Sequence, residues 1–197
     1  MGRQPLPPAT VAGMKGWVGR YVAHNDPLVA GGNFVALVLG WNQPFYPVYL
    51  WFIVGADAWV DVPDVLSAVV FLAIPAIARR RPLLARVLLP LAATANIVLC
   101  MKLLGDGSGI WLFLFPCGML AAGLFRWRER WIMLGLCLLP LAVWLLLKGR
   151  LGAAPVAFGD AQMASIFALN AVSALSLVAF LAWVQAGTRR DAATPEP

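Results

Sequence analysis

The chain has few of the residues from which most catalytic and metal centres are built. Its 197 residues include one histidine, three cysteines and nine acidic residues, and charged residues make up 12% of the total. His24 alone cannot supply the paired axial ligands of haem b. Zinc and di-iron sites need several ligands at regular spacing, and the only glutamates are Glu129 and Glu196. We therefore expect no metal centre and no cofactor.

The sequence also lacks the motifs of the common enzyme classes. We find no nucleophile elbow, zinc-protease motif, phosphate-binding loop or pair of carboxylates within an apolar run. The cysteines, Cys100, Cys117 and Cys137, are odd in number and lie in apolar runs, so packing explains them better than a disulfide or a metal. His24 is expected to cap a helix or face lipid headgroups. Together these absences predict a protein that is not an enzyme.

The shortage of charge accompanies an excess of apolar residues, which make up 61% of the chain. This composition leaves too little polar surface to cover a water-soluble domain. The length accommodates about six spans of roughly 20 residues. The net charge of +6 fits basic loops that are retained in the cytoplasm and attract anionic lipid, and it does not require nucleic acid. We predict an all-α, polytopic membrane protein.

The basic residues occur in alternate loops between the apolar runs. Twelve of the fifteen would lie on one side of the membrane: Arg3, Lys15, Arg20, Arg79, Arg80, Arg81, Arg86, Arg126, Arg128, Arg130, Arg189 and Arg190. The other side would carry Lys102, Lys148 and Arg150, together with the acidic segment 57–64. Because Lys and Arg near span ends stay in the cytoplasm, we expect a multi-pass protein of the bacterial inner membrane with both termini cytoplasmic.

The domain organisation follows from the same pattern. Residues 1–26 are expected to form a disordered start and an interfacial amphipathic helix over 11–23, because Met14, Trp17, Val18 and Tyr21 recur at helical spacing. Residues 27–186 form the six-helix bundle, and 187–197 form a short disordered tail. The predicted spans are 27–53, 62–78, 83–104, 110–125, 131–147 and 163–184.

Uncharged polar residues lie deep inside the predicted spans. Asn96 and Asn170 are in spans 3 and 6, and Ser173 shares a helix face with Asn170 at i,i+3. These groups can hold helices together through interhelical hydrogen bonds, or they can line a ligand cavity. The sequence leaves both possibilities open. An ion-coupled transporter is not favoured, because no charged residue is expected at mid-membrane.

The second half of span 1 contains a predicted break, in the sequence WNQPFYP. Proline interrupts the helix there and frees backbone groups for a ligand. The candidate ligand-binding residues are therefore Trp41, Asn42, Gln43, Tyr46, Asn96, Asn170 and Ser173.

Two short patches resemble a known family. One patch resembles the first helix of one kind of bacterial sensor module; it runs from Tyr21 to Leu28 and continues with Gly31, Gly32, Gly40, Pro44, Tyr46, Pro47 and Trp51. The other patch, from Leu169 to Ser176, resembles the last helix of the same modules. These six-helix modules precede the catalytic domains of histidine kinases, including quorum-sensing receptors for hydrophobic hydroxyketones, and of membrane adenylate cyclases. Residues 187–197 are too short and too rich in proline and alanine for such a domain, so the resemblance implies no catalysis in this chain.

Three functions remain open at this stage. The first is a sensory or regulatory bundle that binds a small apolar or amphipathic molecule and signals to a partner protein or a second copy. The second is a small transporter or permease subunit for a neutral solute. The third is a structural or assembly subunit of a membrane complex.

Overall fold

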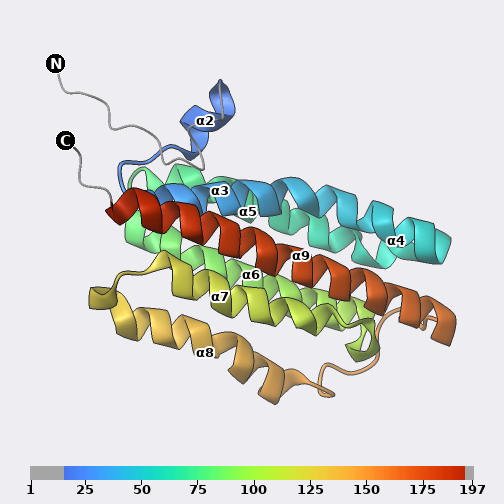
Figure 1. Cartoon of the computed structure of the whole chain (residues 1–197). Coiled ribbons are helices and arrows are strands. Elements are labelled where there is room, and N and C mark those ends of the chain that lie inside the picture. Colours follow the sequence, from blue (N-terminus) through green and yellow to red (C-terminus); the bar gives the residue numbers. More distant parts are fainter. Residues whose placement is uncertain (1–15, 194–197) are drawn as a thin grey trace.

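The computed structural model describes residues 16–193, and in this range the protein is a bundle of helices without a β-strand (Figure 1). The α-helices are α2 (Trp17–Val22), α3 (Pro27–Asn42), α4 (Tyr46–Val54), α5 (Ser67–Ala78), α6 (Pro82–Leu104), α7 (Leu114–Leu124), α8 (Arg130–Leu147) and α9 (Asp160–Ala193). Short 3₁₀ segments join several of them: η1 (Gln43–Phe45), η2 (Gly55–Leu66), η3 (Asp106–Ser108), η4 (Ile110–Phe113) and η5 (Trp127–Glu129).

Local sequence signals explain where α3 begins and where it ends. Asp26 caps the helix by accepting a hydrogen bond from the Leu28 N–H at 3.0 Å, and Pro27 occupies the first helical position. His24 supports this start, because its Nδ1 accepts the Asp26 N–H at 3.0 Å. At the other end the predicted break is confirmed, since η1, which contains Pro44, separates α3 from α4.

The chain doubles back after α4, so that α3 and α5 pack along each other (Figure 1). Gly40 permits the close approach, because a Cβ atom there would lie 2.9 Å from Leu72 Cγ and 3.2 Å from the Ala68 carbonyl oxygen. The following helices α6, α7, α8 and α9 continue the alternation of direction.

Four helical stretches are long and apolar enough to cross a membrane: Pro27–Ala78, Pro82–Leu104, Trp127–Leu147 and Asp160–Arg189. The apolar stretch Ile110–Leu124 is shorter. The first of the four comprises 52 residues and contains the reversal between α4 and α5. The structure therefore establishes an all-helical fold with apolar helices of membrane-spanning length.

The prediction for the C-terminal end of the chain is partly wrong, and parts of both ends lie outside the described residues. The expected disordered tail was placed at 187–197, yet α9 continues to Ala193, so residues 187–193 are helical. Residues 194–197, together with the expected disordered start at 1–10 and the first part of the expected interfacial helix, lie outside the described residues. The described part of that helix, α2, is tied to the bundle: Tyr21 Oη donates to the Leu72 carbonyl at 2.6 Å.

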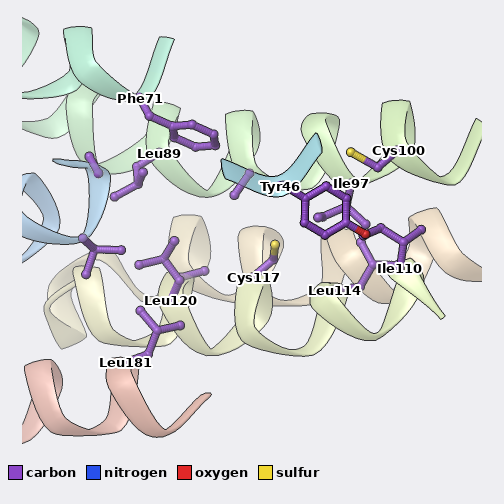
Figure 2. Packing of buried hydrophobic residues seen from close by; sticks show 14 of the residues in the cluster. Tyr46, Phe71, Leu89, Ile97, Cys100, Ile110, Leu114, Cys117, Leu120 and Leu181 are labelled. Carbon is purple, nitrogen blue, oxygen red and sulfur yellow. The ribbon is translucent and has the colours of Figure 1, made fainter. Parts of the chain in front are cut away.

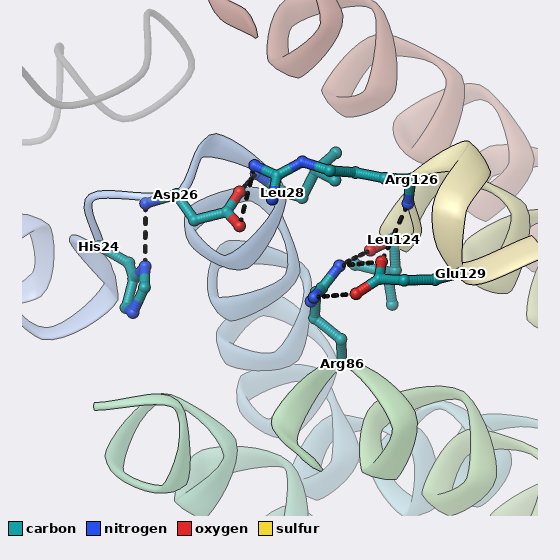
Figure 3. Close-up of polar contacts among 7 residues, drawn as sticks. All are labelled: His24, Asp26, Leu28, Arg86, Leu124, Arg126 and Glu129. Carbon is teal, nitrogen blue, oxygen red and sulfur yellow. Dashed lines mark hydrogen bonds and ion pairs between the residues drawn. The ribbon is translucent and has the colours of Figure 1, made fainter. Parts of the chain in front are cut away.

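One end of the bundle collects most of the basic side chains, and we call it the basic end. It comprises the start of α3, the α5–α6 turn, the α7–α8 turn and the last part of α9 (Figure 1). There Arg86 of α6 lies buried and makes a two-pronged ion pair with Glu129 of η5, at 2.7 and 2.8 Å (Figure 3). Arg86 also donates to the Leu124 carbonyl at 3.0 Å, so it connects α6 with the end of α7 and the start of α8.

A second ion pair at the basic end is more exposed. Arg126 lies 3.1 Å from Asp26, and the Arg126 side chain is 58% exposed whereas that of Arg86 is 7% exposed. The two pairs therefore provide an internal comparison, because burial makes the loss of one partner far more costly.

We predict that Glu129→Ala destabilises the protein by about 3 kcal/mol or more, because it leaves the Arg86 guanidinium buried without its counter-ion. The control Arg126→Ala removes the exposed pair and should cost less than about 1 kcal/mol. SDS-induced unfolding of the purified protein in mixed micelles, followed by tryptophan fluorescence, measures both. Equal losses in the two variants would contradict the assigned role of Arg86.

Candidate functional site

The interior of the bundle contains a cavity of about 380 Å³. Its wall is built by α3, η1, α4, η2, α5, α6, η4, α7 and α9, and Figure 2 shows several of its apolar side chains. Most of the wall is apolar, with contributions such as Phe71, Ile97, Cys117 and Leu120. The polar side chains of the wall are Asn42, Gln43, Tyr46, Tyr49, Asp64, Asn96, Ser173 and Ser176.

The cavity opens on the side of the bundle, between α3–α4 and α9. Four of its lining residues are exposed, and all four come from these helices: Asn42, Tyr49, Val172 and Ser176. The lining residues contributed by α5, α6 and α7 are buried or half-buried. A small molecule would therefore enter laterally, from whatever surrounds the helices.

Contacts between α3 or α4 and α9 close the cavity on either side of this opening. Towards the basic end, Phe34 of α3 packs against Phe180 and Trp183 of α9, with ring centroids 5.8 and 6.5 Å apart. Towards the opposite end, Tyr46 Oη donates a hydrogen bond of 2.6 Å to Asn170 Oδ1. The helices are thus pinned together at two levels, and the opening lies between them.

Asn170 is the centre of a buried polar network. Its side chain is fully buried, and its Nδ2 donates to the Ser108 carbonyl at 2.8 Å while its Oδ1 accepts from Tyr46. One amide thereby joins α9 to α4 and to η3. Both hydrogen-bonding ends of this amide are satisfied, so Asn170 acts in the described structure as an interhelical tie.

Five of the seven candidate residues predicted from sequence line the cavity: Asn42, Gln43, Tyr46, Asn96 and Ser173. Trp41 does not, because its side chain is 69% exposed and packs against Phe45, with ring centroids 6.3 Å apart and the rings tilted by 50°. Asn170 lies behind Tyr46 and outside the lining. The break in span 1 therefore contributes its polar residues to the cavity wall, whereas the Trp41 indole points away from the cavity.

The structure corrects the expectation that no carboxylate pair lies inside the bundle. The segment 57–64 was assigned to an outer loop, but η2 carries part of it back against α6. Asp61 and Asp64 are 0% and 2% exposed, whereas Asp57 of the same segment is exposed. The spacing of the two residues contains the missed signal, because side chains at i and i+3 lie on the same face of a 3₁₀ helix.

Cys100 of α6 completes this second polar group. Its thiol donates to Asp64 Oδ1 at 3.2 Å. The sequence had suggested a packing role alone, and the hydrogen bond adds a polar contact to it. Asp64 also lines the cavity. The Asp64 carboxylate therefore belongs to the cavity wall, and Asp61 lies beside it outside the lining.

The arrangement is suited to holding a small molecule. Apolar walls remove a hydrocarbon group from water, and a small set of amide, hydroxyl and carboxylate groups can orient one polar head. No family model matches the chain, and neither a curated protein nor a solved structure shows significant similarity to it.

We predict that Tyr46→Phe destabilises the protein by about 1–2 kcal/mol, because the change leaves the buried Asn170 Oδ1 without its donor. The control Tyr49→Phe removes the same hydroxyl from a residue that is 44% exposed and should change stability by less than about 0.5 kcal/mol. SDS-induced unfolding again provides the measurement. An unchanged midpoint for Tyr46→Phe would refute the proposed tie.

Proposed function

We propose that this protein is a non-enzymatic membrane sensor or regulator that binds a small amphipathic molecule in the bundle and signals to a partner. The observation that carries the proposal is the cavity with its lateral opening between α3–α4 and α9. Its volume of about 380 Å³ falls within the range of roughly 300–1,000 Å³ that is usual for small-molecule sites.

The position of the opening favours a ligand that is dissolved in the membrane. The helices that frame it belong to stretches of membrane-spanning length, so the opening would face lipid. A molecule with an apolar chain and one uncharged polar head matches the apolar wall and its few polar groups. Medium-chain hydroxyketones, the signals of the sensor modules that the sequence resembles, have this chemistry.

We further propose six membrane crossings, by α3–α4, η2–α5, α6, η4–α7, α8 and α9. The alternating direction of these helices supports this count, as does the gathering of basic residues at one end. In a bacterial inner membrane the basic end would face the cytoplasm, and both termini would lie on that side.

The long helix α9 connects the cavity with the basic end. It lines the opening with Val172 and Ser176 and continues to Ala193. A ligand that binds one arrangement of α3 and α9 more tightly than another shifts the balance between the two arrangements. The shift would reach the cytoplasmic end of α9, where a separate kinase or cyclase, another partner or a second copy of the chain would respond.

The topology can be tested with two engineered cysteines. Asp57→Cys in η2 and Arg128→Cys in η5 place exposed thiols at opposite ends of the bundle. With a membrane-impermeant maleimide on intact spheroplasts, we expect labelling of Asp57→Cys at once and of Arg128→Cys only after permeabilisation. The wild type, whose cysteines are buried or half-buried, gives the background. Labelling of both variants from the same side would contradict the proposed topology.

The binding site can be tested by filling the cavity. In the purified wild type, a medium-chain hydroxyketone, alcohol or fatty acid should raise the melting temperature as its concentration rises. Ser173→Trp places an indole in the cavity wall and should weaken this binding by about tenfold or more, a loss of ~1.4 kcal/mol. Ser165→Trp, at an exposed position of the same helix, should leave binding unchanged. Undiminished binding by Ser173→Trp would exclude the cavity as the site.

A further inference from the structure

Two carboxylates and a thiol meet in the half of the bundle away from the basic end. Oxygen atoms of Asp61 and Asp64 and the Sγ of Cys100 all lie within 4.8 Å of one another, and all three residues are buried. They come from two elements far apart in sequence, η2 and α6, so the fold brings them together and helical spacing alone does not.

The hydrogen bonds of Asp61 provide a second and independent observation. Its side chain is 0% exposed, yet neither carboxylate oxygen has a hydrogen-bond partner. Other fully or nearly fully buried side chains of the described bundle, including Asn33 and Asn170, are hydrogen-bonded. A buried carboxylate without any partner is strongly unfavourable, and a bound cation is one of the few groups that can compensate it.

We propose that Asp61, Asp64 and Cys100 bind a divalent transition-metal ion of the zinc class. A donor set of two carboxylates and one sulfur suits zinc and its neighbours, whereas magnesium and calcium prefer oxygen donors alone. The thiol proton, now donated to Asp64, leaves to water as the metal–sulfur bond forms. Asn96 lies beside Asp64, and its buried side-chain oxygen has no partner in the described structure.

This site does not depend on the proposed sensory function. Asp64 and Cys100 belong both to the proposed metal ligands and to the cavity wall, so a bound metal would stiffen one side of the cavity. The two proposals can nevertheless fail separately, because the metal is tested alone and the amphipathic ligand is tested through Ser173.

Cobalt(II) gives a direct test, because it replaces zinc and reports a sulfur ligand by charge-transfer absorption in the near ultraviolet. The full-length protein is purified in detergent, reduced, treated with chelator and titrated with Co²⁺. We expect saturable binding of one ion per chain with this absorption, and its loss when Zn²⁺ is added. The absorption should vanish in Cys100→Ser and persist in Cys117→Ser, a buried cysteine outside the carboxylate cluster.

The carboxylates are tested by a matched pair in the same segment. Asp61→Asn should weaken Co²⁺ binding by about tenfold or more, whereas Asp57→Asn, at an exposed position of η2, should not. If Asp61→Asn does not fold, the wild-type titration and the cysteine pair decide. Absence of saturable binding in the wild type, or charge-transfer absorption that survives Cys100→Ser, would overturn the proposal. If the wild type binds no Co²⁺ and Asp61→Asn has a higher melting temperature, the Asp61 carboxyl is neutralised by a proton and not by a metal ion.

Discussion

A polar group inside a bundle surrounded by hydrocarbon has to find its partner within the protein, and the position of α9 depends on this constraint. Asn170 meets it by bonding to Tyr46 on one side and to the Ser108 carbonyl on the other. The two bonds hold α9 against α4 and η3. Packing of Phe34 against Trp183 attaches α9 to α3 at a second level. Between these two attachments the helices need not touch, and the cavity lies there.

The same constraint separates the two ends of the bundle. At the basic end the buried Arg86 is matched by Glu129 and the Leu124 carbonyl. In the other half, Asp61 has no such match among the described residues. The cavity lies between an end whose buried charge has a counter-ion and an end with an uncompensated carboxylate. We infer from this contrast that the basic end is held rigidly by its buried ion pair. In the other half, the proposed cation would balance the charge of the buried carboxylates.

Much of the helical layout could be predicted from the sequence, because apolar runs, proline positions and the Asp26 cap mark where helices begin and break. The rotation of each helix could not. A helix such as α3 is apolar on nearly every face, so no polar stripe shows that Trp41 turns outward while Asn42 lines the cavity. The return of η2 into the bundle was missed because an acidic segment between apolar runs is usually a loop.

An experimental structure in lipid nanodiscs tests the central claim most directly. The account predicts an open cavity between α3 and α9, bordered by the Tyr46–Asn170 hydrogen bond and by Asp64, with density for a lipid-like or amphipathic molecule inside it. A bundle in which side chains have collapsed to fill this space, or in which η2 has swung out to expose Asp61 and Asp64 to water, would contradict it.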